Sequence, residues 1–171
     1  MGLSHGFNPQ SKIIMTTDLK QLSKELRQNS PRLSEMPITI FHLVRKINKG
    51  DLILPTPTKA WTNQRKSEYI ESIYLNYPLA WFYSQKIETG EFLMKRGIER
   101  ALTIIEYFDG TLKLTGLKRL PVLQNYSLEE IHEVDVWLYD KFAERKITMY
   151  VSLSKLPPKE NDEAVRRSLW R

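Results

Sequence analysis

The chain contains no cysteine and only three histidines, so several classes of chemistry are not expected. Without cysteine there can be no disulfide, no thiol catalysis and no cysteine zinc site. The histidines, His5, His42 and His132, lie far apart in the sequence, which makes a histidine metal centre unlikely to assemble. We therefore predict no metal site.

Long apolar stretches are also missing. No apolar run reaches the roughly 20 residues that a membrane-spanning helix needs, and the N-terminus lacks the basic and apolar regions of a signal peptide. These absences predict a cytoplasmic protein without membrane contact. The 171 residues, 41% of them hydrophobic and 11% aromatic, are enough for one folded domain with one core.

Positive charge is in excess. The formal net charge is +6, and the calculated isoelectric point is about 9.4. Such a balance favours anionic partners, among them nucleic acid, nucleotides and acidic protein surfaces. Charge alone does not choose among these partners.

The hydrophobic pattern predicts a compact α+β domain with an added N-terminal helix. We expect a flexible arm over 1–16, the N-terminal helix and a linker over 17–35, an α+β domain over 36–156 and a helical segment over 157–171. A narrow leucine stripe in the N-terminal helix favours packing on the domain over docking to another chain. The stripe consists of Leu19, Leu22 and Leu26.

Within the domain, alternation and capping signals place the individual elements. A hairpin is expected from the strands over 79–87 and 92–94, and a capping box at Ser127 and Glu130 opens a helix whose inward face includes Val134 and Phe142. The remaining expected elements are helices over 39–48 and 64–76, a helix after Gly97, and strands over 51–54, 112–115 and 146–153.

The sharpest functional signal is the junction where the second hairpin strand runs through Gly97 into a helix. A helix start presents backbone N–H groups without partners and favours an anion. Gly97 allows close backbone approach, while Arg96 and Arg100 add charge. The alternative is that Gly97 only turns the chain and that both arginines are solvated.

The surrounding sequence resembles a known family. Three stretches carry the resemblance: the segment from Ser67 that begins Ser-Glu-Tyr-Ile-Glu-Ser-Ile-Tyr, the glycine junction, and the later Tyr-Phe-Asp-Gly-Thr-Leu-Lys-Leu. They are similar to the ParB/sulfiredoxin-like N-terminal domain of GmrSD-type modification-dependent restriction systems. The resemblance extends from about Ile38 to Leu169. It implies a ParB/sulfiredoxin-like fold, with a small mixed sheet flanked by helices. It also implies nucleotide binding and hydrolysis that drive or gate a nuclease, with a nucleoside triphosphate as the candidate ligand.

Both signature motifs depart from that family. Its Asp-Gly-Gln-Gln-Arg motif reads Arg-Gly-Ile-Glu-Arg here, so Arg96 replaces the acid that would serve a metal or a proton transfer. Its second motif falls at 55–61, with Lys59 near the position of the family's arginine; Gln64-Arg65, beyond Trp61, is interpreted as a coincidence. Glu99 is the one carboxylate left at the junction.

Three hypotheses follow. The first, which we prefer, is a catalytically degenerate domain that binds DNA, a nucleotide or a partner protein, linked to phage defence or a mobile element. It places a phosphate on Arg96, Gly97, Arg100 and Lys59, in a cleft that Trp61 and Tyr83 could line. The others are a structural or assembly subunit of a larger complex, and a divergent nucleotide-dependent nuclease component that uses Glu99.

Overall fold

The computed structural model describes residues 9–29 and 33–153 of the chain. The chain divides into two compact units, which we describe separately: Met1–Arg32 with Leu156–Arg171, and Leu33–Lys155. The helical segment expected over 157–171 lies outside the described residues, as do residues 1–8 of the expected arm. Among the residues described, no helix combines the length and apolar character needed to cross a bilayer.

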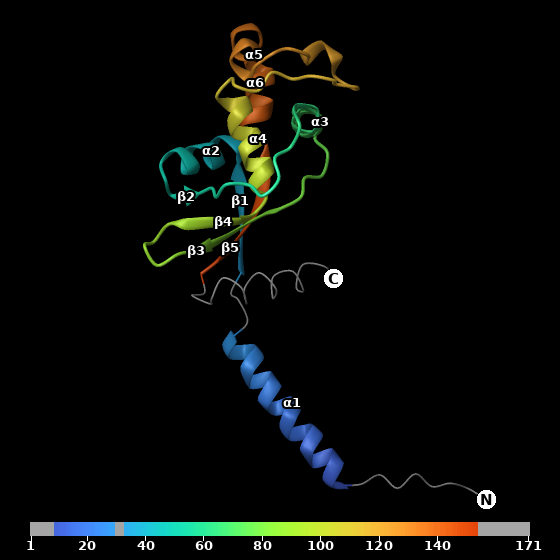
Figure 1. The fold of residues 1–171 in the computed structure, drawn as a ribbon, viewed down its shortest axis with the longest axis vertical. Helices are drawn as coiled ribbons and strands as arrows, with labels where there is room; N and C mark the ends of the chain where they lie inside the picture. The colour runs from blue at the N-terminus through green and yellow to red at the C-terminus, as the bar shows by residue number, and fades with distance from the viewer. Residues whose placement is uncertain (1–8, 30–32, 154–171) are drawn as a thin grey trace, which may run out of the picture. The chain divides into compact units, whose positions relative to one another are not determined.

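In the first unit, the described element is helix α1, Pro9–Asn29 (Figure 1). The predicted arm is therefore wrong for residues 9–16, which are helical. A proline is well suited to the first turn of a helix, because the N–H that it lacks would have no partner there. Within the described part of this unit, no contact buries Leu19, Leu22 or Leu26. The packing of the stripe on the domain stays a prediction.

The second unit contains a five-stranded mixed sheet in the order β1-β5-β3-β4-β2, which confirms the predicted α+β class. The β1–β5 and β3–β4 pairs are antiparallel, and the β5–β3 and β4–β2 pairs are parallel. The expected hairpin is therefore present as β3 and β4. The strands are β1 (Leu33–Thr39), β2 (Leu52–Ile53), β3 (Phe82–Lys86), β4 (Phe92–Arg96) and β5 (Lys146–Ser152).

Strand β1 was not predicted, because residues up to 35 were assigned to a linker. Its sequence alternates poorly, and Pro37 lies within it. A proline is tolerated in an edge strand, where one row of backbone groups needs no partner. β1 occupies such an edge, paired with β5 alone.

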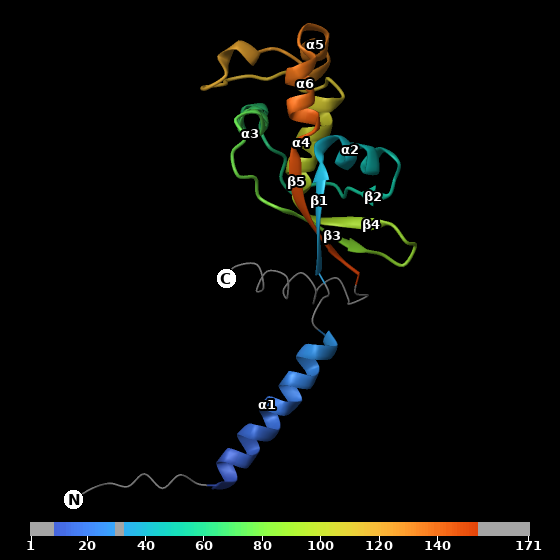
Figure 2. The ribbon, with the colours of Figure 1, turned by 180° about the vertical axis from the view of Figure 1, so that it is seen from behind.

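Helix α4 lies between α2 and α3 and contacts both (Figures 1 and 2). An aromatic cluster packs between α3, α4 and α6, which carry its three rings: the Tyr74 and Phe142 ring centroids are 5.5 Å apart, and those of Tyr107 and Phe142 are 5.1 Å apart. The helices are α2 (Ile40–Asn48), α3 (Asn63–Tyr74), α4 (Ile98–Phe108), α5 (Leu128–Val134), α6 (Val136–Ala143) and the short 3-10 helix η1 (Pro121–Leu123).

Two predicted elements differ. Residues 112–115 form no strand, although Leu112 and Leu114 are buried, because Leu114 pairs its backbone with the 125–126 segment instead. The helix expected to run from Ser127 through Phe142 breaks at Asp135, which leaves the α-helical region and caps α6 by accepting a 3.1 Å hydrogen bond from the backbone N–H of Leu138. The break leaves Val134 79% exposed rather than in the core.

The predicted capping box at the start of α5 is confirmed. The Ser127 backbone N–H donates to Glu130 Oε2 at 2.7 Å, and Lys113 Nζ donates to Glu130 Oε1 at 2.9 Å. The backbone hydrogen bond from Ser127, followed by the Lys113 ammonium, lowers the pKa of Glu130 to about 2. The Glu130 carboxylate therefore stabilises the folded state near neutral pH, and this contribution is lost as the pH falls from about 4.5 to about 2.

We expect Glu130→Gln to lower the melting temperature at pH 7 and to flatten its decline between pH 4.5 and pH 2, since glutamine cannot titrate. Thermal unfolding followed by circular dichroism at a series of pH values measures both effects. Parallel curves for the variant and the wild type would contradict the role of Glu130.

Candidate functional site

The predicted junction lies at the end of β4, where Gly97 is the N-cap of α4. Its backbone has φ +89° and ψ 14°, a left-handed conformation, and it supplies no side-chain cap. A Cβ atom at this position would lie 2.6 Å from Cδ1 of Phe82 and 3.1 Å from Nη2 of Arg100. The close approach predicted for Gly97 is thus an approach to the Phe82 ring, which the core buries fully.

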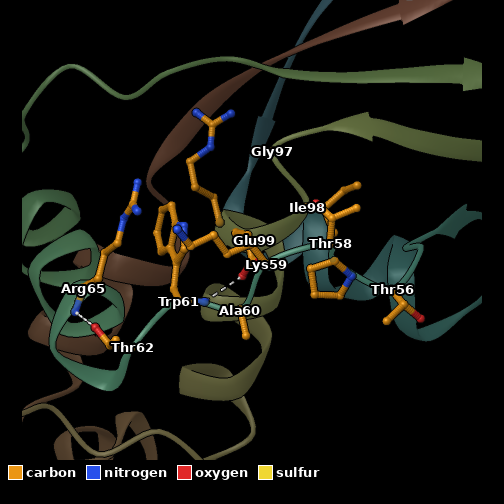
Figure 3. Close-up of a pocket in the computed structure, with 12 residues that line it drawn as sticks. Thr56, Thr58, Lys59, Ala60, Trp61, Thr62, Arg65, Gly97, Ile98 and Glu99 are labelled. Carbon is orange, nitrogen blue, oxygen red and sulfur yellow. Dashed lines mark hydrogen bonds between the residues drawn. The ribbon is translucent and has the colours of Figure 1, made fainter.

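A cavity of about 620 Å³ lies between the 56–62 loop and the first turn of α4 (Figure 3). It brings together four residues that the sequence placed at the site: Lys59, Gly97, Glu99 and Arg100. Its lining residues are Thr56, Pro57, Thr58, Lys59, Ala60, Trp61, Thr62, Arg65, Gly97, Ile98, Glu99 and Arg100.

Glu99 joins the two walls of the cavity. Its Oε2 accepts a hydrogen bond from the backbone N–H of Trp61 at 3.3 Å, drawn as a dashed line in Figure 3. Its Oε1 is buried and has no hydrogen-bond partner in the described part of the chain. Because a buried carboxylate oxygen normally has a donor, this atom is an acceptor available to a water molecule or a ligand.

The guanidinium of Arg100 is mainly engaged in contacts with other residues of the protein. Its Nη1 donates to the carbonyl of Ala80 at 2.6 Å, its Nη2 donates to the carbonyl of Trp81 at 2.9 Å, and its guanidinium lies 4.9 Å from the centroid of the Phe82 ring. Burial lowers the pKa of Arg100. An arginine nevertheless stays charged in proteins. Arg100 therefore anchors the chain before β3 while it contributes positive charge to the cavity.

Arg96 does not line the cavity. Its guanidinium lies over Trp81, 4.8 Å from the ring centroid, in cation–π geometry. Arg96 is the last residue of β4, before the left-handed turn, so its side chain projects from the sheet and not from the first turn of α4. Tyr83, a predicted lining residue, is 1% exposed within the core and does not line the cavity either.

The structure adds Arg65, which sequence reasoning had set aside as a coincidence. Arg65 lies in the first turn of α3, where its backbone N–H donates to Oγ1 of the N-cap Thr62 at 3.3 Å. Its guanidinium lies 4.5 Å from the centroid of the Trp61 ring, and Trp61 meets Tyr69 edge-on at 5.7 Å. One signal in the sequence could have placed Arg65 at the cavity. Arg65 follows the N-cap Thr62 closely, and Thr62 ends the loop that carries Lys59.

The cavity is therefore lined by three cations and one carboxylate. Within the described residues, Lys59 and Arg65 form no ion pair, whereas three other lysines do. In the same part of the chain, no group of three or more histidine, aspartate or glutamate side chains is arranged to hold a metal ion. The arrangement is suited to binding an anion beside a partly exposed aromatic ring.

Comparison with known proteins gives no match: no family model fits the chain, and neither a curated protein nor a solved structure resembles it significantly.

Proposed function

We propose that the cavity at the start of α4 binds a phosphate group of DNA or of a nucleotide, and that the chain acts as a binding protein without catalysis. One observation supports this: Lys59 and Arg65 line the same cavity as the first turn of α4. Neither side chain has an ion-pair partner in the described residues. A volume of about 620 Å³ lies within the usual range of small-molecule sites.

In this proposal, Lys59 and Arg65 donate charge-assisted hydrogen bonds from the loop side. The backbone N–H groups of the first turn of α4 donate from the other side, because the first turn of a helix has no acceptors for them. Gly97 adds no side chain that would cap those groups. Arg100 positions the segment before β3 and strengthens the positive potential, while its two carbonyl contacts occupy part of its donor capacity.

We propose a role without catalysis because the cavity contains few acidic side chains. Glu99 is the one carboxylate among the residues that line the cavity, and one of its oxygens is engaged with the loop backbone. The metal ions of phosphoryl-transfer sites are usually held by one or two carboxylates, and here the single carboxylate is already partly occupied. The altered Arg-Gly-Ile-Glu-Arg motif agrees with the same interpretation, and the resemblance to restriction-system domains makes phage defence or a mobile element the proposed setting.

A second candidate function is a divergent nucleotide-dependent nuclease component. It is favoured by one observation: Oε1 of Glu99 is buried beside the cavity without a hydrogen-bond partner in the described residues. A free acceptor at that position could receive a proton from an attacking water molecule.

Titration with labelled duplex DNA and with a labelled nucleoside triphosphate, each at two salt concentrations, tests the proposal. We expect Lys59→Ala and Arg65→Ala each to weaken binding by about tenfold, because each removes one charge-assisted hydrogen bond. For DNA, each substitution should also reduce the slope of log affinity against log salt by about one. The two ligands distinguish a DNA-binding from a nucleotide-binding role.

Lys86→Ala is the matched control, since Lys86 is exposed at the far end of β3 and does not line the cavity. Equal weakening by Lys86→Ala would indicate nonspecific attraction and would contradict the proposed site. Nucleotide hydrolysis that disappears in Glu99→Gln would instead support the second candidate.

A further inference from the structure

A second pair of arginines lies at the opposite end of α3 from the cavity. Arg119, in the loop before η1, places its guanidinium 5.9 Å from the centroid of the Tyr77 ring. Arg145 donates from Nη2 to the backbone carbonyl of Tyr77 at 3.0 Å. Neither arginine has an ion-pair partner in the described residues, and Tyr77 is 41% exposed. We call these three residues the Tyr77 cluster.

The Tyr77 cluster repeats the arrangement found at the cavity. There, the Arg65 guanidinium lies 4.5 Å from the centroid of the Trp61 ring, which is partly exposed. Trp61 lies just before α3 and Tyr77 lies just after it, so an arginine stands beside an aromatic ring at each end of one helix. α3 has 12 residues, and at about 1.5 Å per residue it is about 18 Å long.

Both ends are reached along one side of α3. At 3.6 residues per turn, Arg65, Glu68 and Ser72 fall within about 60° of one another, on the face opposite the buried residues of the helix. The backbone N–H of Tyr77 donates to the Ser72 carbonyl at 3.0 Å, which places Tyr77 at the end of this row. The row therefore leads from the cavity to the Tyr77 cluster.

Positive charge exceeds negative charge along this row. Lys118, whose side chain is 75% exposed, lies beside the middle of the row, with its ammonium 3.8 Å from the partly exposed Glu68 carboxylate. The loop that carries Lys118 is fixed against α3, because the backbone N–H of Arg119 donates to Oε1 of the buried Glu71 at 2.7 Å. Arg65, Lys118 and Arg119 are all exposed, so Glu68 is the exposed acid that three exposed cations face.

We propose that a single strand of DNA crosses this side of α3, with one phosphate in the cavity and a later one at the Tyr77 cluster. The inference rests on the proposed phosphate site and selects DNA, rather than a free nucleotide, as its ligand. A nucleoside triphosphate carries its charges on three adjacent phosphates, which can occupy one of the two ends. A strand has a phosphate at every nucleotide, at least about 3.4 Å apart, so about three to five nucleotides span α3.

The two aromatic rings favour an unpaired strand. Bases without a pairing partner stack on exposed aromatic side chains whatever their sequence, and Trp61 and Tyr77 offer one such ring at each end of the row. A base within a duplex is stacked between its neighbours and reaches such a ring only when it is flipped out. The arginine beside each ring adds cation–π attraction and a donor for the adjacent phosphate.

Fluorescence anisotropy with the full chain tests the proposal, using labelled oligodeoxythymidylates of about two to twelve nucleotides and a labelled nucleoside triphosphate. We expect the affinity to rise with strand length until the strand spans α3, at about five nucleotides, and to change little beyond that. The longer strands should bind about 100-fold more tightly than the triphosphate, because one molecule then joins two sites.

Substitutions outside the cavity separate the strand path from the phosphate site. Lys118→Ala and Arg119→Ala should each weaken binding of a strand of about eight nucleotides by about tenfold and reduce its salt slope by about 0.7, with the triphosphate affinity unchanged. Glu68→Gln should strengthen strand binding by about threefold, because it removes negative charge from the path and frees Lys118. Lys59→Ala should weaken both ligands, since Lys59 lines the cavity.

Arg45→Ala is the matched control for Arg119→Ala. Arg45 is an exposed arginine of α2, and α4 lies between α2 and α3 (Figures 1 and 2). It should bind both ligands like the wild type.

Three results would overturn the inference. Equal affinity for the triphosphate and the long strand, with Lys59→Ala weakening both, would leave the phosphate site standing and exclude the strand path. Strand binding that Arg119→Ala weakens but Lys59→Ala does not would remove the cavity from the site, and both proposals would fail together. Tighter binding of a duplex than of a single strand of the same length would contradict the stacking of unpaired bases on Trp61 and Tyr77.

Discussion

Gly97→Ala is expected to destabilise the second unit by about 3 kcal/mol or more, from two effects that add. A left-handed backbone costs a residue with a Cβ atom about 1–2 kcal/mol, and overfilling a packed core costs typically about 1–3 kcal/mol. Both apply, because φ at Gly97 is +89° and the added Cβ would lie 2.6 Å from Cδ1 of Phe82. The ring cannot easily move away, since Phe82 is fully buried. Unfolding in guanidinium chloride measures the loss.

Gly50→Ala separates the two effects. Gly50 has a similar φ of +80°, but a Cβ there would meet no atom within 4 Å. It should therefore pay the backbone cost alone and lose about 1–2 kcal/mol. Adding Phe82→Leu to Gly97→Ala should recover part of the lost stability relative to the sum of the single changes, because the smaller side chain leaves room for the Cβ. Equal losses at Gly97 and Gly50 would show that the contact with Phe82 is unimportant.

The sequence predicted the glycine junction for a good physical reason. A glycine between an alternating strand and an apolar helical pattern marks a sharp turn, and both flanking elements depend on local periodicity. The same local signals located α2, α3, the hairpin, the capping box and β5. What they could not provide was the direction of each charged side chain, because that depends on where the loops and strands outside each helix place the aromatic rings.

Arg96 and Arg65 illustrate the limit. Arg96 lies over Trp81 on another segment, a pairing that spacing in the sequence does not predict. Arg65 lies over Trp61, four residues earlier, but Trp61 precedes the N-cap Thr62, so the helical periodicity of α3 did not include this ring. As a result, the predicted cluster lost Arg96 and gained Arg65, while Lys59 and Glu99 came together only through the fold of the 56–62 loop. The break at Asp135 was missed for a related reason: the capping aspartate stands inside an otherwise continuous helical pattern.

A buried acid on α3 holds the loop that precedes η1. Glu71 is 7% exposed, and its Oε1 accepts hydrogen bonds from the backbone N–H groups of Arg119 at 2.7 Å and Leu120 at 2.8 Å. The loop leads directly into η1. Glu71 therefore connects α3 to the loop that precedes η1.

Glu71→Ala should lower the free energy of unfolding by about 3 kcal/mol, because it removes two partly buried hydrogen bonds to a charged acceptor, each worth about 1.5–3 kcal/mol. Glu71→Gln keeps an acceptor in the same place and should cost about 1 kcal/mol, the difference between charged and neutral hydrogen bonds. Urea unfolding measures the stability, and hydrogen exchange should show lost protection at the amides of Arg119 and Leu120.

Glu68→Ala, one turn earlier on α3, is the control for Glu71→Ala. Glu68 is partly exposed and its carboxylate lies 3.8 Å from the Lys118 ammonium, a surface pair worth at most about 1 kcal/mol. If Glu71→Ala costs no more than Glu68→Ala, the two backbone hydrogen bonds do not hold the loop.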